Sequence, residues 1–278
     1  MDNLGFRTVR PIAPAAEKKA EAPAAMSRIA VALEPPVAHI TLQHAPLNVI
    51  DIPMMDELAT ALDEIEERAD IAVVLLSATG KAFSVGVDVA AHTPDKVQEM
   101  LSKFHGVILK LVGTKKVTVA VVRGHCLGGG AELAMVCDLV YTSETATWAF
   151  PEIKLGCYPP VAATALAALV GQKHAADLVL TGRSIPGSEA AAMGLANRAV
   201  ADEQLDAAVE ESLKSLSELS PAALGVTKKA IYAWSSMHFD KGLARAEQIY
   251  LDELMKTEDA QEGIRAFVEK RKPVWKGR

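Results

Sequence analysis

Hydrophobic and polar positions along this chain follow two periods, which predicts strands alternating with helices. Short runs rich in β-branched residues have the length of buried strands, whereas Leu58, Leu62 and Ile65 recur at helical spacing. The predicted strands are 29–33 and 37–42, a hairpin around Glu34-Pro35-Pro36, and then 72–77, 117–122, 139–142 and 147–150. The predicted helices are 54–69, 93–111, 131–137 and 161–170. This alternation indicates an α/β fold for the first two thirds of the chain.

From residue 175 onward the pattern is almost entirely helical. The predicted segments are 190–193, 203–219, 221–235 and 241–255. Residues 1–27 are instead rich in Ala, Pro, Lys and Glu and contain no apolar stretch, which predicts a disordered N-terminal tail. An organellar transit peptide is the alternative, but Glu17 and Glu21 are unusual in such peptides. We therefore expect a tail at 1–27, an α/β core at 28–220 and a helical region at 221–278.

Composition narrows the possible partners and the compartment. Half of the 278 residues are apolar, which is enough for a substantial core, and 35 acidic against 29 basic residues give a net charge of −6. This charge disfavours nucleic acid as a partner, and no apolar run approaches the ~20 residues of a membrane span. The three cysteines, Cys126, Cys137 and Cys157, have no CxxC spacing. They predict reduced thiols and a cytoplasmic protein.

The segment 117–138 carries the strongest chemical signal. A β-branched strand is followed by Gly128, Gly129 and Gly130 and then by a helix with Glu132 in its first turn. The glycines remove every Cβ where backbone must approach a ligand, and unpaired N–H groups gather at a helix start. This layout suits a developing negative charge, either a phosphate or an oxyanion, with Glu132 as an adjacent acid or base.

Five ordered segments carry a family resemblance. They are Lys81-Ala82-Phe83-Ser84-Val85-Gly86-Val87-Asp88, Gly124-His125-Cys126-Leu127-Gly128-Gly129-Gly130-Ala131-Glu132-Leu133-Ala134, Phe150-Pro151-Glu152-Ile153-Lys154-Leu155-Gly156, Leu180-Thr181-Gly182-Arg183 with 190–196, and 266–272. Together they strongly resemble the enoyl-CoA hydratase/isomerase (crotonase) family from residue 28 to the end. The resemblance implies a spiral of ββα repeats whose helical C-terminal region mediates assembly into homotrimers, which commonly pair into hexamers.

The resemblance also implies an acyl-CoA substrate and a mechanism. The thioester oxygen would be held by the N–H groups of Val87 and Gly129, because proton transfer at the neighbouring carbon puts charge on that oxygen. Glu132 would activate a water that adds at the β carbon, and Glu152 would protonate the α carbon. Family isomerases often keep only one such acid, so the pair favours hydration. Neither a metal nor a cofactor beyond the coenzyme A of the substrate is implied.

The sequence also allows other activities, and purely structural roles for the two glutamates. An isomerase or a hydrolase on the same scaffold would need only one of the acids or different pocket groups. A noncatalytic relative that binds RNA or protein would carry a basic early helix, whereas the charged residues of 54–69 are mainly acidic. Glu132 could merely stabilise its helix N-terminus, and Glu152 could be a solvated loop residue. His92, His105 and His125 show no metal-ligand spacing, and His125 lies near the glycines.

Further residues are candidates for substrate binding. Val85, Gly86 and Gly128 flank the expected oxyanion site, and Asp88 either caps the following turn, which we favour, or contacts substrate. By resemblance, Phe267 and Lys270 would hold the adenine and phosphates of coenzyme A. The alternative is that Phe267 is a core residue of an amphipathic helix and that Lys270 lies on its solvated face.

The chain departs from the family pattern after Gly156. Many hydratases continue with a proline and a glycine-rich stretch, whereas this chain has Cys157-Tyr158-Pro159-Pro160. Tyr158 and two prolines should stiffen the loop that borders the acyl group in relatives. This loop, with 47–51 and 85–89, is most similar to hydratases of cyclic dienoyl-CoA thioesters, which act in anaerobic breakdown of aromatic acids. A rigid wall suits a ring or a short straight chain.

Overall fold

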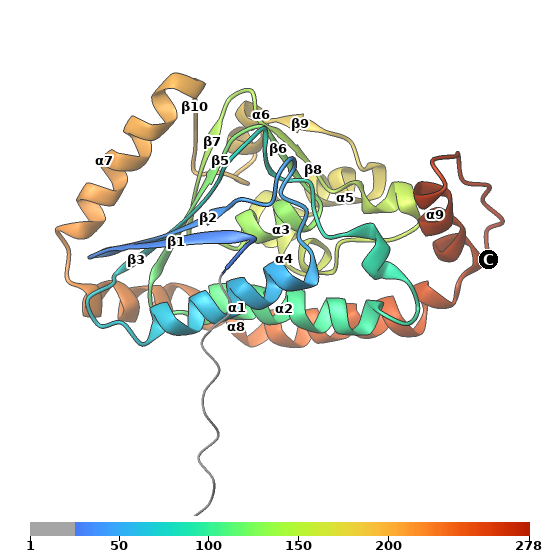
Figure 1. Ribbon diagram of the computed structural model, residues 1–278, viewed down its shortest axis with the longest axis horizontal. Coiled ribbons are helices and arrows are strands. Elements are labelled where there is room, and N and C mark those ends of the chain that lie inside the picture. The colour runs from blue at the N-terminus through green and yellow to red at the C-terminus, as the bar shows by residue number, and fades with distance from the viewer. Residues whose placement is uncertain (1–25) are drawn as a thin grey trace, which may run out of the picture.

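The computed structural model describes residues 26–278, apart from the side chains of 234–238, and contains two β-sheets (Figure 1). The larger sheet has the order β1-β2-β3-β5-β7-β10 and the smaller has the order β4-β6-β8-β9. The larger sheet consists of β1 (Ile29–Glu34), β2 (Val37–Leu42), β3 (Val73–Ala78), β5 (Val117–Val122), β7 (Leu139–Ser143) and β10 (Arg198–Val200). The smaller sheet consists of β4 (Ala82–Ser84), β6 (His125–Leu127), β8 (Thr147–Ala149) and β9 (Ile185–Pro186). Among the strand pairs of residues 26–278, the β1–β2 hairpin and the β8–β9 pair are antiparallel and the others are parallel.

A ββα unit repeats along the chain and builds both sheets at once. The three successive units are β3-β4-α2 (Val97–Gly113), β5-β6-α3 (Gly129–Met135) and β7-β8-α4 (Pro160–Val170). Each unit gives its first strand to the larger sheet and its second strand to the smaller one. The chain therefore advances by one strand in both sheets per unit, which winds it into the predicted spiral. Strand β5 is buried along its whole length, as expected for a central parallel strand covered on both faces.

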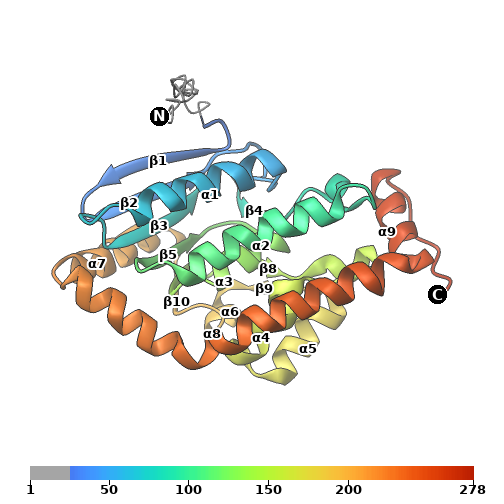
Figure 2. The same cartoon turned by 90° about the horizontal axis from the view of Figure 1, so that it is seen from below.

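Helices cover both faces of the larger sheet, three long helices on one face and residues 205–217 on the other. Helices α1 (Ile52–Glu66), α2 and α8 (Pro221–Asp252) run side by side beneath the strands (Figures 1 and 2). Helix α1 begins where Asp51 Oδ1 accepts the N–H of Met54 at 2.9 Å. The remaining helices are α5 (Gln172–Thr181), α6 (Gly187–Ala192), α7 (Leu205–Ser217), α9 (Glu258–Val268) and the short 3₁₀ turns η1 (Val89–His92), η2 (Pro151–Leu155), η3 (Asp202–Gln204) and η4 (Leu254–Lys256).

The structure contains elements that the sequence did not predict. Strands β4, β6, β9 and β10 are absent from the prediction, because two or three residues are too few to show a clear alternation of apolar and polar positions. Strand β10 corrects the expectation of an almost entirely helical region after residue 175, since it pairs with β7 at the edge of the larger sheet. The predicted helices 221–235 and 241–255 form the single helix α8. The residues between them, 236–240, contain neither glycine nor proline to end a helix.

Two positions in the structure lie at the boundaries expected from the sequence, residues 27 and 220. Residues 1–25 of the expected tail lie outside the described residues, whereas Glu57 already anchors Ser27 and Arg28 by accepting both N–H groups at 2.8 Å. Helix α8 begins at Pro221, the predicted start of the helical region. No helix in the described part of the chain is both long and apolar enough to cross a membrane.

A buried ion pair fastens α8 to the sheet. Lys228 Nζ lies 2.8 Å from Asp138 Oδ2 and donates to the carbonyl of Lys116 at 2.9 Å, and its side chain is only 7% exposed. The same carboxylate oxygen accepts the N–H of Thr118 at 2.7 Å, at the start of β5. Because removing one partner would leave a charge buried without its counterion, this contact should govern the stability of the C-terminal region.

We predict that Lys228→Met lowers the free energy of unfolding by roughly 3–5 kcal/mol, since Asp138 would lose its buried counterion. Chemical denaturation monitored by circular dichroism measures this change. The matched control is Lys229→Met, because Lys229 is the next residue and is exposed. Equal stabilities of the two variants would show that the ion pair does not hold α8.

Candidate active site

The centre of the site is a close approach between two backbone segments. The loop after β4 packs against the start of α3, and a Cβ on Gly129 would lie 2.7 Å from Val87 Cγ2 and 3.3 Å from Val87 N. Gly86, with φ of +102°, lets that loop turn beside the helix. Within the described chain, neither the N–H of Val87 nor that of Gly129 has a hydrogen-bond acceptor. Two adjacent N–H donors are therefore free to bind one oxygen.

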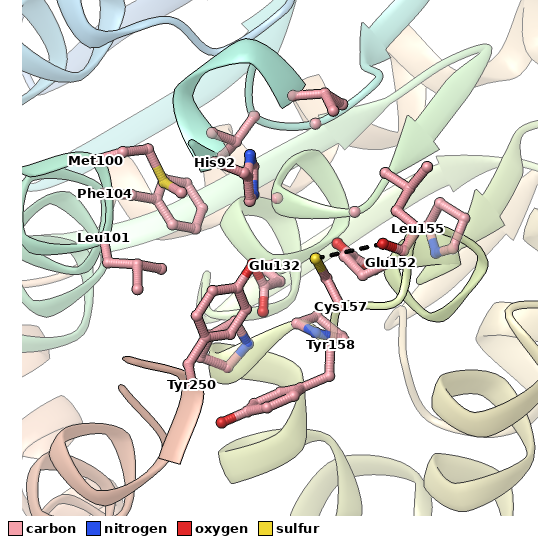
Figure 3. Close-up of a pocket in the computed structure, with 18 of the residues that line it drawn as sticks. His92, Met100, Leu101, Phe104, Glu132, Glu152, Leu155, Cys157, Tyr158 and Tyr250 are labelled. Carbon is pink, nitrogen blue, oxygen red and sulfur yellow. Dashed lines mark hydrogen bonds between the residues drawn. The ribbon is translucent and has the colours of Figure 1, made fainter. Parts of the chain in front are cut away.

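Glu132 lies in the first turn of α3, buried to 3% exposure. Its Oε1 accepts the N–H of Ala162 at 2.9 Å, and Ala162 lies in the first turn of α4. Glu132 therefore caps the N-terminus of α4. The alternative that it stabilises only the N-terminus of its own helix, α3, does not describe this contact. This bond fixes one carboxylate oxygen and orients the side chain at the cavity (Figure 3).

Glu152 approaches the same cavity from η2. Glycine is required at position 128 for two reasons. A Cβ there would lie only 2.6 Å from Glu152 Oε1, and the backbone has a φ of +53°, which residues with a side chain rarely adopt. Glu152 Oε2 is buried and has no hydrogen-bond partner in the described chain. Glu152 is thus not the solvated loop residue of the alternative interpretation.

Burial dominates the electrostatics of the two carboxyl groups. It raises the pKa of Glu132 to about 7, although the N–H groups of Ala162 and Val161 favour the charged form. Burial, and then the charge of Glu132, raise the pKa of Glu152 well above its usual range. Near neutral pH the pair therefore contains a protonated Glu152 beside a Glu132 that is able to accept a proton. This combination supplies an acid and a base in one cavity.

The cavity walls come from elements far apart in the sequence (Figure 3). Apolar side chains of α2, Tyr250 of α8 and Ile264 of α9 close it, and burial lowers the pKa of His92, which also lines it. Sequence reasoning missed these contributors. The lining residues are Val85, Gly86, Val87, Val89, His92, Met100, Leu101, Phe104, Gly128, Gly129, Glu132, Pro151, Glu152, Leu155, Cys157, Tyr158, Pro159, Pro160, Tyr250 and Ile264.

The structure brings together most, but not all, of the residues predicted from the sequence. Val85, Gly86, Gly128 and Tyr158 line the cavity with the two glutamates. Asp88 caps η1, since its Oδ1 accepts the N–H of Ala90 at 3.0 Å, and it is not among the lining residues. This is the cap that the sequence favoured.

Phe267, Lys270 and His125 lie outside the cavity. The Phe267 side chain is 54% exposed, so it is not the core residue of the alternative interpretation, and Lys270 just beyond α9 is exposed as well. His125 is exposed on β6. Among the described residues, no cluster of His, Cys, Asp and Glu has the arrangement of a metal site.

The fold and the cavity define a class of protein: a ββα spiral in which two backbone N–H donors and two buried carboxyl groups face one cavity. Residues 33–278 match the model of the enoyl-CoA hydratase/isomerase family. The chain is 34% identical over 239 residues to a cyclohexa-1,5-dienecarbonyl-CoA hydratase of Thauera aromatica, covering 86% of this chain and 92% of that protein. It is 36% identical over 238 residues to a probable enoyl-CoA hydratase of Rhizobium meliloti, covering 84% and 91%.

Solved structures agree with these relatives. An enoyl-CoA hydratase from Mycobacterium avium subsp. paratuberculosis K-10 superimposes with a TM-score of 0.82 at 27% identity, covering 90% of this chain and 99% of that one. The chain therefore belongs to the enoyl-CoA hydratase/isomerase family, and the predicted family and crotonase fold are confirmed.

We predict that Glu132→Gln raises the melting temperature by several degrees at pH 8 and by less at pH 5. Because the folded-state pKa of Glu132 is raised from 4.5 to about 7, wild-type stability falls as pH rises through that interval, by up to roughly 3 kcal/mol. Glutamine has no charge to bury. Differential scanning calorimetry at both pH values measures the change, with Glu64→Gln on the exposed face of α1 as control. A gain independent of pH would contradict this explanation.

Proposed function

We propose that this protein is an enoyl-CoA hydratase that adds water across the double bond of an enoyl-CoA thioester. The observation that carries the proposal is the pair of buried carboxyl groups, Glu132 and Glu152, in one cavity with the free N–H groups of Val87 and Gly129. An isomerase needs one group to move one proton, whereas hydration needs a base for the water and an acid for the carbon.

In the proposed mechanism, the thioester oxygen accepts the N–H groups of Val87 and Gly129. Ionised Glu132 takes a proton from water as the water oxygen bonds the β carbon, and the electrons of the double bond move toward the thioester oxygen. The two N–H groups stabilise that charge in a site without bulk water. Protonated Glu152 then supplies the α proton, and transfer of a proton from Glu132 to Glu152 restores the starting state. The mechanism uses no cofactor beyond the coenzyme A of the substrate.

We further propose a cyclic dienoyl group as the acyl part of the substrate. Two observations support this choice: the similarity to the protein from Thauera aromatica, and the side of the cavity that Tyr158, Pro159 and Pro160 form beside Glu132. Pro159 and Pro160 are rigid, and the Tyr158 ring meets the Tyr250 ring edge to face with centroids 5.3 Å apart. A rigid, partly aromatic wall complements a flat six-membered ring, and a short straight acyl chain is the competing candidate.

Phe267 and Lys270 are proposed to bind the adenine and phosphates of coenzyme A. An exposed aromatic face and an exposed ammonium group, three residues apart at the end of α9, suit a purine and a phosphate.

We also propose assembly into a homotrimer or a dimer of trimers, supported by Val226 and Ile231, which are 70% and 67% exposed on α8. Sedimentation equilibrium decides the assembly. The three buried free cysteines support a reducing, cytoplasmic location.

We predict that Glu132→Gln and Glu152→Gln each lower kcat at least ~100-fold, because each removes one of the two proton-transfer groups. The measurement is loss of the absorbance of the conjugated thioester, with crotonyl-CoA and cyclohexa-1,5-diene-1-carbonyl-CoA as substrates. Full activity of either variant would overturn the two-acid mechanism. Faster hydration of crotonyl-CoA than of the cyclic substrate by the wild type would overturn only the choice of a cyclic acyl group.

The oxyanion site is tested at Gly129. We predict that Gly129→Pro lowers kcat by about 100- to 1,000-fold relative to Gly129→Ala, because only proline removes the N–H donor. Both variants introduce a Cβ that would meet Val87 Cγ2, so alanine controls for that contact. Steady-state kinetics with crotonyl-CoA, after circular dichroism has established folding, gives the ratio. Equal rates of the two variants would exclude a catalytic role for this N–H.

A further inference from the structure

Tyr250 brings an unused hydrogen-bond donor into the active-site cavity. Its side chain reaches the cavity from α8 and is only 1% exposed (Figure 3). The hydroxyl has no hydrogen-bond partner in the described chain. Buried polar groups in folded proteins are nearly always paired, so an unpaired donor facing a cavity indicates a group that arrives with a ligand or with water.

Two neighbouring side-chain donors are already paired. The Tyr158 hydroxyl donates to the carbonyl of Ala246 at 2.5 Å, and the Cys157 thiol donates to the carbonyl of Leu155 at 3.7 Å. Burial, with smaller contributions from Cys157 and Glu152, raises the pKa of Tyr250 above its ordinary value. The Tyr250 hydroxyl is therefore protonated, and the nearby Cys157 sulfur, which is only a weak acceptor, leaves it able to donate to a stronger one.

Helix α8 holds this hydroxyl in place through contacts one turn earlier. His105 Nδ1 of α2 lies 2.6 Å from Glu247 Oε2, and Ala246 receives the Tyr158 hydroxyl. The rings of Tyr158 and Tyr250 then meet edge to face. Since α8 is attached to both α2 and the loop before α4, the position of Tyr250 relative to Glu132 is set by three separate elements.

We propose that the Tyr250 hydroxyl is a third catalytic residue, which donates a hydrogen bond to the oxygen that is added to the acyl chain. The inference rests on the proposed function. Hydration involves two oxygens besides those of the carboxyl groups: the thioester oxygen, which the N–H groups of Val87 and Gly129 hold, and the oxygen of the water. The second oxygen is the one left for Tyr250.

This role fits the hydrogen-bonding capacity of water. A water molecule has two protons and two lone pairs. Glu132 takes one of the protons, and the hydrogen bond from Tyr250 occupies one lone pair, which directs the other lone pair at the β carbon. After addition, the same phenol donates to the new hydroxyl group. Tyr250 keeps its proton throughout, so the proton balance of the reaction is unchanged.

The test is Tyr250→Phe, which removes only the hydroxyl oxygen. We expect kcat for hydration of crotonyl-CoA to fall about 10- to 100-fold with less than about a threefold change in KM, because the bond orients the water and not the thioester. The control is Tyr232→Phe, on the same helix but lining a different cavity, which should change kcat less than about twofold. Thermal melting should show no loss of stability in Tyr250→Phe, since no protein hydrogen bond is removed.

A binding measurement separates this inference from the proposed function. In the Glu132→Gln background, which prevents turnover, we expect 3-hydroxybutyryl-CoA to bind about 10-fold more tightly than butyryl-CoA, and Tyr250→Phe to abolish the preference. Calorimetry measures both affinities. Wild-type kcat retained by Tyr250→Phe, or an unchanged preference, would overturn the role of Tyr250 and leave the hydratase proposal intact. Absence of wild-type turnover with every enoyl-CoA would overturn the hydratase, and the affinity ratio would still decide whether Tyr250 binds a ligand hydroxyl.

Discussion

Everything in this site depends on two backbone segments packing together without side chains between them. The loop that ends at Val87 belongs to one ββα unit and the helix that begins at Gly129 belongs to the next, and the missing Cβ of Gly129 lets the two N–H groups lie side by side. A Cβ at this position would lie 2.7 Å from Val87 Cγ2 and 3.3 Å from Val87 N, so the Val87 side chain or its loop would have to shift. The spiral repeat is what makes this possible, because it places equivalent ends of successive units next to one another.

The same packing creates the electrostatic conditions for acid–base chemistry. Gly128 leaves room for the carboxyl group of Glu152, and the start of α4 binds the carboxylate of Glu132 through Ala162. Both acids are thereby held away from water, and burial raises both pKa values. A buried carboxylate lowers stability at neutral pH, so the protein keeps this pair at the expense of folding free energy.

Helices α8 and α9 complete the site as well as extending the fold. The Lys228–Asp138 ion pair attaches the first half of α8 to the sheet, and the His105–Glu247 contact attaches its second half to α2. Tyr250 and Ile264 then form walls of the cavity that the ββα units alone would leave open. The C-terminal region therefore lines the same cavity as the two glutamates.

The sequence by itself indicated an α/β fold, and its resemblance to the family indicated the ββα spiral and the candidate site residues. The hydrophobic pattern predicted β1, β2, β3, β5 and β7, because long buried strands show a clear pattern, but it did not predict the three-residue edge strand β10 of the same sheet. The ordered glycine and glutamate segments, through the family resemblance, pointed to Glu132, Glu152 and the N–H groups of Val87 and Gly129. Two-residue strands and the continuity of α8 were beyond its reach, because they are decided by pairing partners and packing. Only the tertiary structure showed that Tyr250 and Ile264 reach the site, because proximity across a hundred residues leaves no local signal in the chain.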